Sequence, residues 1–146
     1  MRKIIMILTG ICLLMVAYSQ TDSKIVVFQN DAEIMGFDIP EYSRFSPSNQ
    51  DYLEVDSIVA NYVLSHSANQ TFDKEIIDNY SDYSKQIYGL VNTKGDKILL
   101  VNCFYGNHKD WKNNTVAVRG GGRNYFSIKI NLKNNSISDF WVNSPK

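Results

Sequence analysis

The spacing of apolar residues changes near Ser84, and this change leaves few folds open to the chain. Between Ser48 and Val63 the apolar residues recur at steps of three and four, which is the period of one helix face. From Ser84 onward apolar and polar residues alternate, as they do in a strand with one buried face. One apolar helix face and several alternating strands bury both surfaces most simply by packing against each other. The order of the two patterns therefore predicts an α+β fold with a helix layer and a sheet layer.

Ser48 marks the predicted start of the helix. Its hydroxyl and the carboxylate of Asp51 have the spacing of a capping box, which satisfies main-chain amides of the first turn. The helix is predicted to end near 66–69, and the segment 71–83 fits either a short second helix around 73–77 or a direct return to the sheet. The predicted apolar face consists of Tyr52, Val55, Ile58, Val59, Tyr62 and Val63.

A meander of four or five antiparallel strands is predicted after the helix, because turn segments separate the alternating runs. Asn92–Gly95 and Lys133–Ser136 have turn composition, and the glycine suits a positive φ angle. The run Ile98–Val101 is apolar at consecutive positions, which is typical of a central strand covered on both faces. The predicted strands are Gln86–Val91, Lys97–Tyr105, Thr115–Val118, Tyr125–Leu132 and Ile137–Val142.

The chain divides into three predicted parts. Residues 1–19 form a leader, residues 20–47 form an irregular lead-in with a first short strand over 24–28, and residues 48–146 form the helix and the sheet. A long helix packed on a curved four- to five-stranded antiparallel sheet, in this order, resembles the cystatin-like architecture. The resemblance is one of topology only, and similarity at the level of the fold does not carry function.

The leader has the three parts of a secretory signal. Arg2-Lys3 gives a basic start, Ile4–Val16 is an apolar run, and Ala17-Tyr18-Ser19 places small residues before a cut after Ser19. The apolar run is shorter than the roughly 20 residues that span a membrane. We therefore expect cleavage and no stable membrane span afterwards, with an uncleaved anchor as the alternative. The mature domain is expected to be exported, either periplasmic or secreted.

The composition of the mature chain excludes several classes of function. Removing residues 1–19 leaves 127 residues (146 − 19), the size of one domain. Two basic residues leave with the leader, so 13 Lys and Arg (15 − 2) oppose 15 Asp and Glu, a net charge of −2. This balance lacks the basic excess that nucleic-acid binding requires. Cys103 is the only cysteine left, which excludes an intrachain disulfide and a Cys-rich zinc site. We expect no cofactor.

A set of short motifs runs through residues 83–143. They are Tyr83-x-Lys85-Gln86-x-Tyr88-Gly89, Lys94-Gly95-x-Lys97, Val101-Asn102-Cys103-Phe104, Trp111, Gly120-Gly-Gly122, Phe126-Ser-Ile-Lys-Ile-Asn-Leu132 and Asp139-Phe-Trp-Val-Asn143. In these motifs the chain resembles a group of small exported bacterial proteins of unknown function. That group has no assigned catalytic or binding residues, so the resemblance implies an exported single domain and no particular activity.

The loop Gly106–Trp111 is the best candidate for a binding surface. Loops mounted on a rigid sheet often carry function, and Trp and Tyr are favoured contact residues. The alternative is that Trp111 folds back as a lid over the core. The glycines at 120–122 are predicted to form a hairpin connection beside this loop, because a strand follows them and a phosphate loop requires a helix. The candidate binding residues are Tyr105, His108, Lys109, Trp111, Arg119 and Arg123.

These features favour a non-enzymatic binding or envelope-associated domain whose partner is a protein or an envelope component. If Arg119 and Arg123 contact that partner, the partner is expected to be anionic. A thiol enzyme or small hydrolase is one alternative, because His108 or His66 supplies the base that a Cys103 nucleophile needs. The alternation of Cys103 with Leu99 and Val101 favours instead a small buried side chain.

A cystatin-like protease inhibitor is the other alternative. Cystatins present a Gln-x-Val-x-Gly hairpin to their target. Gln86-Ile-Tyr-Gly89 is one residue shorter than that motif and has no valine, so the match fails.

Overall fold

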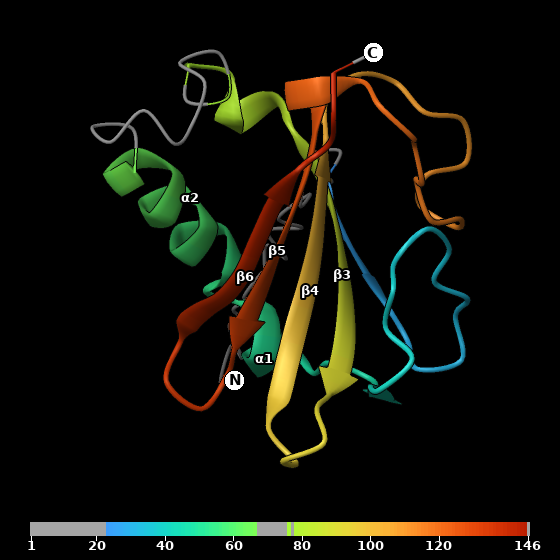
Figure 1. Ribbon diagram of the computed structural model, residues 1–146, viewed down its shortest axis with the longest axis vertical. Coiled ribbons are helices and arrows are strands. Elements are labelled where there is room, and N and C mark those ends of the chain that lie inside the picture. Colours follow the sequence, from blue (N-terminus) through green and yellow to red (C-terminus); the bar gives the residue numbers. More distant parts are fainter. Residues whose placement is uncertain (1–22, 67–75, 77, 146) are drawn as a thin grey trace, which may run out of the picture.

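A computed structural model shows a helical segment packed on one face of an open sheet (Figure 1). The structure describes residues 23–66, 76 and 78–145, so the predicted leader at 1–19 and most of the predicted helix at 73–77 lie outside it. The elements are β1 (Ile25–Phe28), β2 (Ser43–Phe45), α1 (Asn49–Tyr52), α2 (Val55–His66), the 3-10 helix η2 (Tyr80–Asp82), β3 (Ser84–Val91), β4 (Lys97–Phe104), the 3-10 helix η3 (Gly122–Asn124), β5 (Tyr125–Asn131) and β6 (Ser136–Val142). The predicted α+β class is confirmed.

The sheet has six strands, where the sequence predicts four or five. Their order is β1-β3-β4-β5-β6, and β2 also pairs with β3. Strands β3 to β6 form the predicted antiparallel meander, with β4 in the centre. Strand β1 runs parallel to β3 with Ile25 opposite Lys85, whereas β2 runs antiparallel with Phe45 opposite Gly89. The two short strands of the lead-in thus pair with opposite ends of one long strand.

The prediction of a strand over Thr115–Val118 is wrong. The segment pairs with no strand in the described part of the chain, and buried side chains bind its main chain instead. Asn102 Nδ2 donates a hydrogen bond to the carbonyl of Val116 (2.9 Å), and the Val116 N–H donates to Gln86 Oε1 (2.9 Å). These two amide side chains supply the partners that a neighbouring strand supplies in a sheet.

The helical layer begins as the sequence predicts. Ser48 is the N-cap of α1, and its N–H and hydroxyl both donate to Asp51 Oδ2 at 2.7 Å, which confirms the capping box. A turn at Leu53 and Glu54 separates α1 from α2. The buried residues of α2 face the sheet, and they form one core with sheet residues and with two residues of the segment between α2 and β3: Val55, Val59, Val63, Ile76, Tyr83, Ile87, Leu99, Val101, Cys103, Phe126, Ile128 and Ile130.

The opposite face of the sheet is also covered. A second apolar cluster lies there, formed by Phe28, Tyr88, Leu90, Ile98 and Leu100, and partly buried residues of the segment before β2 pack against it. Covering on both faces explains why Ile98–Val101 of β4 is apolar at consecutive positions. In Figure 1 the blue to cyan segment after β1 and the orange segment after β4 both lie on the side of the sheet away from α2.

Candidate functional site

The segment 105–124, here called the β4–β5 loop, contains every predicted binding residue. It leaves β4 at the top of Figure 1, extends to the upper right and returns through η3 to β5. Tyr105 follows β4 directly. The residue is 44% exposed, and its N–H donates to the carbonyl of Asn124 (2.8 Å). The two ends of the loop are therefore joined by a main-chain hydrogen bond, and they hold the loop at one end of the sheet.

Two buried amide side chains fix the middle of the β4–β5 loop to the sheet. Gln86 Nε2 donates to the carbonyls of Trp111 (2.6 Å) and Asn114 (2.7 Å). Its Oε1 accepts from the Val116 N–H (2.9 Å) and from Asn102 Nδ2 (3.1 Å). Both Gln86 and Asn102 are buried, so these bonds form in a low-dielectric setting in which they are strong and costly to lose.

His108 and Trp111 pack inward against aromatic rings. Their rings meet Phe104 edge to face, with centroid distances of 5.1 Å and 5.5 Å. His108 Nε2 also shares a hydrogen bond with the Tyr125 hydroxyl at 3.1 Å. Both side chains are half-buried, so the interpretation of Trp111 as a lid over the sheet is the one that the geometry supports. Their role in the loop is to hold its shape.

The cationic side chains of the β4–β5 loop point outward. Lys109, Arg119 and Arg123 are all exposed, and in the sequence they lie before and after the half-buried Trp111. The carbonyl of Arg123 accepts a hydrogen bond from the Tyr83 hydroxyl (2.8 Å), which fixes the main chain of η3 while the side chain remains at the surface. The structure thus places the predicted residues in one loop and divides them into an aromatic inner group and a basic outer group.

The glycine turn is also fixed in position. Gly121 has φ +82°, and a Cβ built there would lie 2.5 Å from the Tyr125 ring, so only glycine fits. Asn143 Nδ2 donates to the carbonyls of Val118 (2.6 Å) and Gly120 (3.0 Å). The glycine segment is therefore a tight turn that is bound to the end of the chain after β6, and it is not the predicted hairpin connection because no strand directly precedes it in the described chain.

Cys103 lies in the core, as its alternation with Leu99 and Val101 predicts. It is fully buried beneath the helical layer, and burial raises the pKa of its thiol to about 12. Reactive thiols require a lowered pKa and solvent access, and Cys103 has neither. Its neighbour across the strands is Lys85, and His108 lies on the opposite side, among the residues over Phe104. The side chain of His66 lies outside the described part of the structure.

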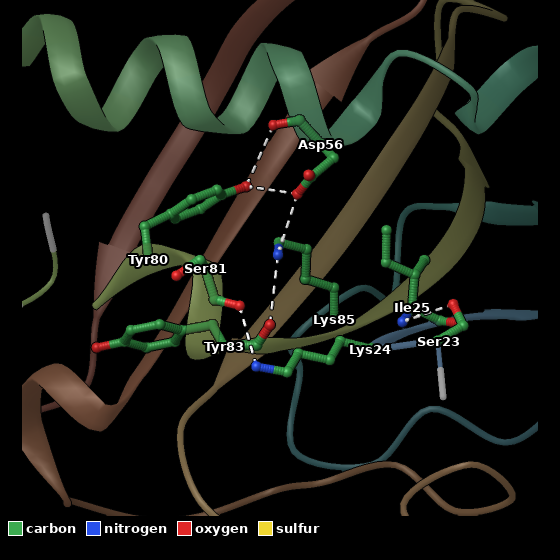
Figure 2. Close-up of polar contacts among 8 residues, drawn as sticks. All are labelled: Ser23, Lys24, Ile25, Asp56, Tyr80, Ser81, Tyr83 and Lys85. Carbon is green, nitrogen blue, oxygen red and sulfur yellow. Dashed lines mark hydrogen bonds and ion pairs between the residues drawn. The ribbon is translucent and has the colours of Figure 1, made fainter. Parts of the chain in front are cut away.

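A buried lysine, which the sequence interpretation missed, lies beside Cys103. Only 5% of the Lys85 side chain is exposed, and its Nζ lies 3.0 Å from Asp56 Oδ1 and donates to the carbonyl of Tyr83 at 3.3 Å (Figure 2). Nζ also lies 4.5 Å from the centroid of the Tyr80 ring. The Tyr80 hydroxyl donates to the same Asp56 oxygen (3.0 Å), and burial raises the pKa of that hydroxyl. An alternating strand with lysine at an inward position was the only sequence signal for this cluster.

A groove opens between the β1 edge of the sheet and the helical layer. Its volume is about 550 Å³, within the range of ligand-binding clefts. One wall is β1, from Ser23 to Gln29, and the other includes Pro47, Asn49, Tyr52, Leu53 and Asp56. The sequence analysis did not predict this groove, because its two walls belong to segments whose pairing only the fold decides.

The described residues provide no metal centre and no membrane-spanning helix. Within 23–66, 76 and 78–145, no three His, Cys, Asp or Glu side chains come together, and no helix is long and apolar enough to cross a bilayer. Comparison of the chain with protein-family models, with curated proteins and with solved structures finds no match.

Proposed function

We propose that the mature chain is an exported, non-enzymatic domain that binds an anionic component of the cell envelope through the β4–β5 loop. The observation that carries the proposal is a long loop without strands that buried side chains of the sheet hold in one conformation. Loops of this length without regular structure are uncommon in compact domains and are usually functional. Fixing the loop in advance reduces the entropy that binding has to overcome.

The charge of the β4–β5 loop indicates the chemistry of the partner. Residues 105–124 include Lys109, Lys112, Arg119 and Arg123 but only one acid, Asp110, which gives a net charge of +3 (4 − 1). The mature chain as a whole has a net charge of −2, so the rest of it carries −5 (−2 − 3). Such asymmetry orients the loop toward an anionic surface.

Three features support binding over catalysis. Cys103 is buried with a raised pKa, His108 is held against Tyr125, and Lys85 is paired with Asp56. These three groups are thus engaged in the packing of the domain. The segment Gln86–Gly89 lies inside β3 with Gln86 and Tyr88 buried, so it offers no hairpin of the kind that cystatins insert into a protease.

The test measures binding of the leader-free chain to vesicles that contain an anionic phospholipid and to soluble polyglutamate. Vesicles of zwitterionic phospholipid are the negative probe. Each basic residue near an anionic surface contributes about 1 kcal/mol, so the double variant Lys109→Glu with Arg119→Glu should bind more than roughly tenfold more weakly. Binding should also fall as salt rises, because exposed charges are screened.

The matched control is Lys94→Glu with Lys133→Glu, which makes the same change of charge in the β3–β4 and β5–β6 turns. Both turns lie at the bottom of the sheet in Figure 1, opposite the β4–β5 loop, and both lysines are exposed. This variant should retain at least half of the binding. Failure to bind either anionic probe at low salt, or equal loss in both double variants, would contradict the proposal.

A further inference from the structure

Strand β1 is one edge of the sheet in the described part of the chain, and its residues are apolar. It pairs only with β3 in the described part of the chain, and its residues Ile25–Phe28 include no charge and no proline. Natural proteins usually block such edges with charges, proline or a covering segment, because unpaired main-chain groups attract other strands. The groove of about 550 Å³ runs along this edge.

The register shows which main-chain groups of β1 face the groove. The Lys24 carbonyl accepts from the Lys85 N–H at 2.7 Å, so residue 24 and the alternate positions after it turn their main-chain groups toward β3. The main-chain groups of Ile25 and Val27 therefore point to the other side. Ser23 Oγ lies 3.3 Å and 3.2 Å from the N and O of Ile25 and satisfies both groups (Figure 2). Those of Val27 have no partner among the described residues.

The facing wall is suited to side chains of two kinds. Leu53, in the turn between α1 and α2, is 74% exposed, and the partly buried Tyr52 lies beside it. Asp56 is the one charged residue of the wall, and 54% of its side chain is exposed. Lys85 and the Tyr80 hydroxyl both contact Oδ1 of this carboxylate, and Oδ2 has no partner in the described structure. The wall thus offers an apolar surface and one carboxylate oxygen that can accept a hydrogen bond.

We infer that this groove binds an extended segment of a partner protein, which adds to the sheet as a strand beside β1. The segment pairs with the main chain of Val27, directs apolar side chains toward Leu53 and Tyr52, and places a lysine or arginine near Asp56. Main-chain pairing supplies affinity in this mode of recognition, and the alternate side chains supply specificity. Lys85 occupies Oδ1 of the carboxylate, and the remaining Oδ2 oxygen selects the occupant, because it accepts a hydrogen bond from a lysine or arginine and repels an acidic side chain.

This site is independent of the proposed anion binding. The β4–β5 loop contributes none of the residues that line the groove. The groove is lined by a carboxylate and the loop is basic, so the two surfaces call for partners of opposite charge. One domain with both surfaces can hold a basic peptide segment while it is attached to an anionic part of the envelope.

The test is selection of binders to the leader-free chain from a phage-displayed library of random peptides. Enriched peptides should alternate apolar residues and include lysine or arginine, and the same peptides N-methylated at alternate amides should lose binding. Val27→Pro removes the outward N–H without removing a bond to β3 and should weaken binding about tenfold. Leu53→Arg changes an exposed residue, leaves the fold intact, and should weaken binding by a similar factor by introducing a cation beside Asp56.

Leu64→Arg is the matched control, because Leu64 is an exposed leucine of α2 that does not line the groove. Its affinity for the selected peptides should equal that of the parent chain, as should that of Lys109→Glu with Arg119→Glu. No enriched peptide, or peptides that bind Leu53→Arg and Val27→Pro as tightly as the parent, would overturn the inference. A dimer in sedimentation that Val27→Pro dissociates would also overturn it, since a second copy would then occupy the edge.

Discussion

Replacing Gln86 by leucine tests whether buried side chains of the sheet hold the β4–β5 loop in place. Leucine has nearly the volume of glutamine, so the change removes hydrogen bonds and creates little cavity. The Val116 N–H loses its partner while buried, and the carbonyls of Trp111 and Asn114 lose bonds of 2.6 Å and 2.7 Å. Asn102 Nδ2 loses its bond of 3.1 Å to Gln86 Oε1 but keeps its bond to the Val116 carbonyl.

The expected cost follows from these losses. A buried donor without a partner costs about 1–3 kcal/mol, and each further hydrogen bond contributes about 1 kcal/mol. Gln86→Leu should therefore lower the free energy of unfolding by about 4–6 kcal/mol, as measured by urea denaturation with an unchanged m-value. In native-state hydrogen exchange, the Val116 amide should lose most of its protection, while amides of β4 and β5 change only as global stability requires.

Gln50→Leu is the matched control, because Gln50 is exposed in α1. It should change the free energy of unfolding by less than about 0.5 kcal/mol. A cost below about 1 kcal/mol for Gln86→Leu, or a Val116 amide that exchanges as slowly as in the parent chain, would refute the argument that Gln86 fixes the loop.

Three further predictions concern the core and the turns. Cys103 should react with a thiol reagent only in denaturant. In the folded state its pKa of about 12 lies above the ordinary value of 9, so the free energy of unfolding should fall as pH rises from about 9 to 12. Cys103→Ala should reduce that alkaline loss, as measured by urea titrations at each pH. Asp56→Ala should cost about 2 kcal/mol in urea unfolding, because it leaves the buried ammonium of Lys85 unpaired. Lys85→Met should cost less than about 1 kcal/mol, because the carboxylate that it leaves is half-exposed. Equal costs for the two variants would contradict this order. Gly121→Ala should cost about 3 kcal/mol in thermal melts, since the new Cβ meets an aromatic ring 2.5 Å away. Gly95→Ala is the control at the same φ of +82°; its Cβ meets no atom within 4 Å, so it should cost about 1 kcal/mol.

Local patterns predicted the parts of the fold that are themselves local. The capping box at Ser48 needs only Asp51 three residues later, and the structure contains it. The alternation after Ser84, with short turns between β3 and β4 and between β5 and β6, predicts an antiparallel meander, because each strand pairs with the next along the chain. The consecutive apolar residues of β4 likewise correctly predicted that both faces of this strand are covered.

The failures concern partners that are distant in the sequence. Strand β2 has only three residues, too few to show an alternation of apolar and polar positions. It forms because β3 is long enough to pair with both β1 and β2. Thr115–Val118 has strand composition but contacts Gln86 and Asn102 instead of a strand. A polar residue at an inward strand position does not reveal which main-chain group it will bind, because that group comes from another part of the chain.

The same division applies to the candidate sites. The sequence by itself determined the α+β class, the central position of β4, the inward position of Cys103 and the loop that holds the basic residues, because hydrophobic period and composition act over neighbouring residues. Only the tertiary structure decided that His108 and Trp111 pack inward, that Lys85 is paired with Asp56, and that β1 leaves an open edge beside α1. Each of these depends on how segments dozens of residues apart meet, and the free energy of that packing is a property of the whole fold.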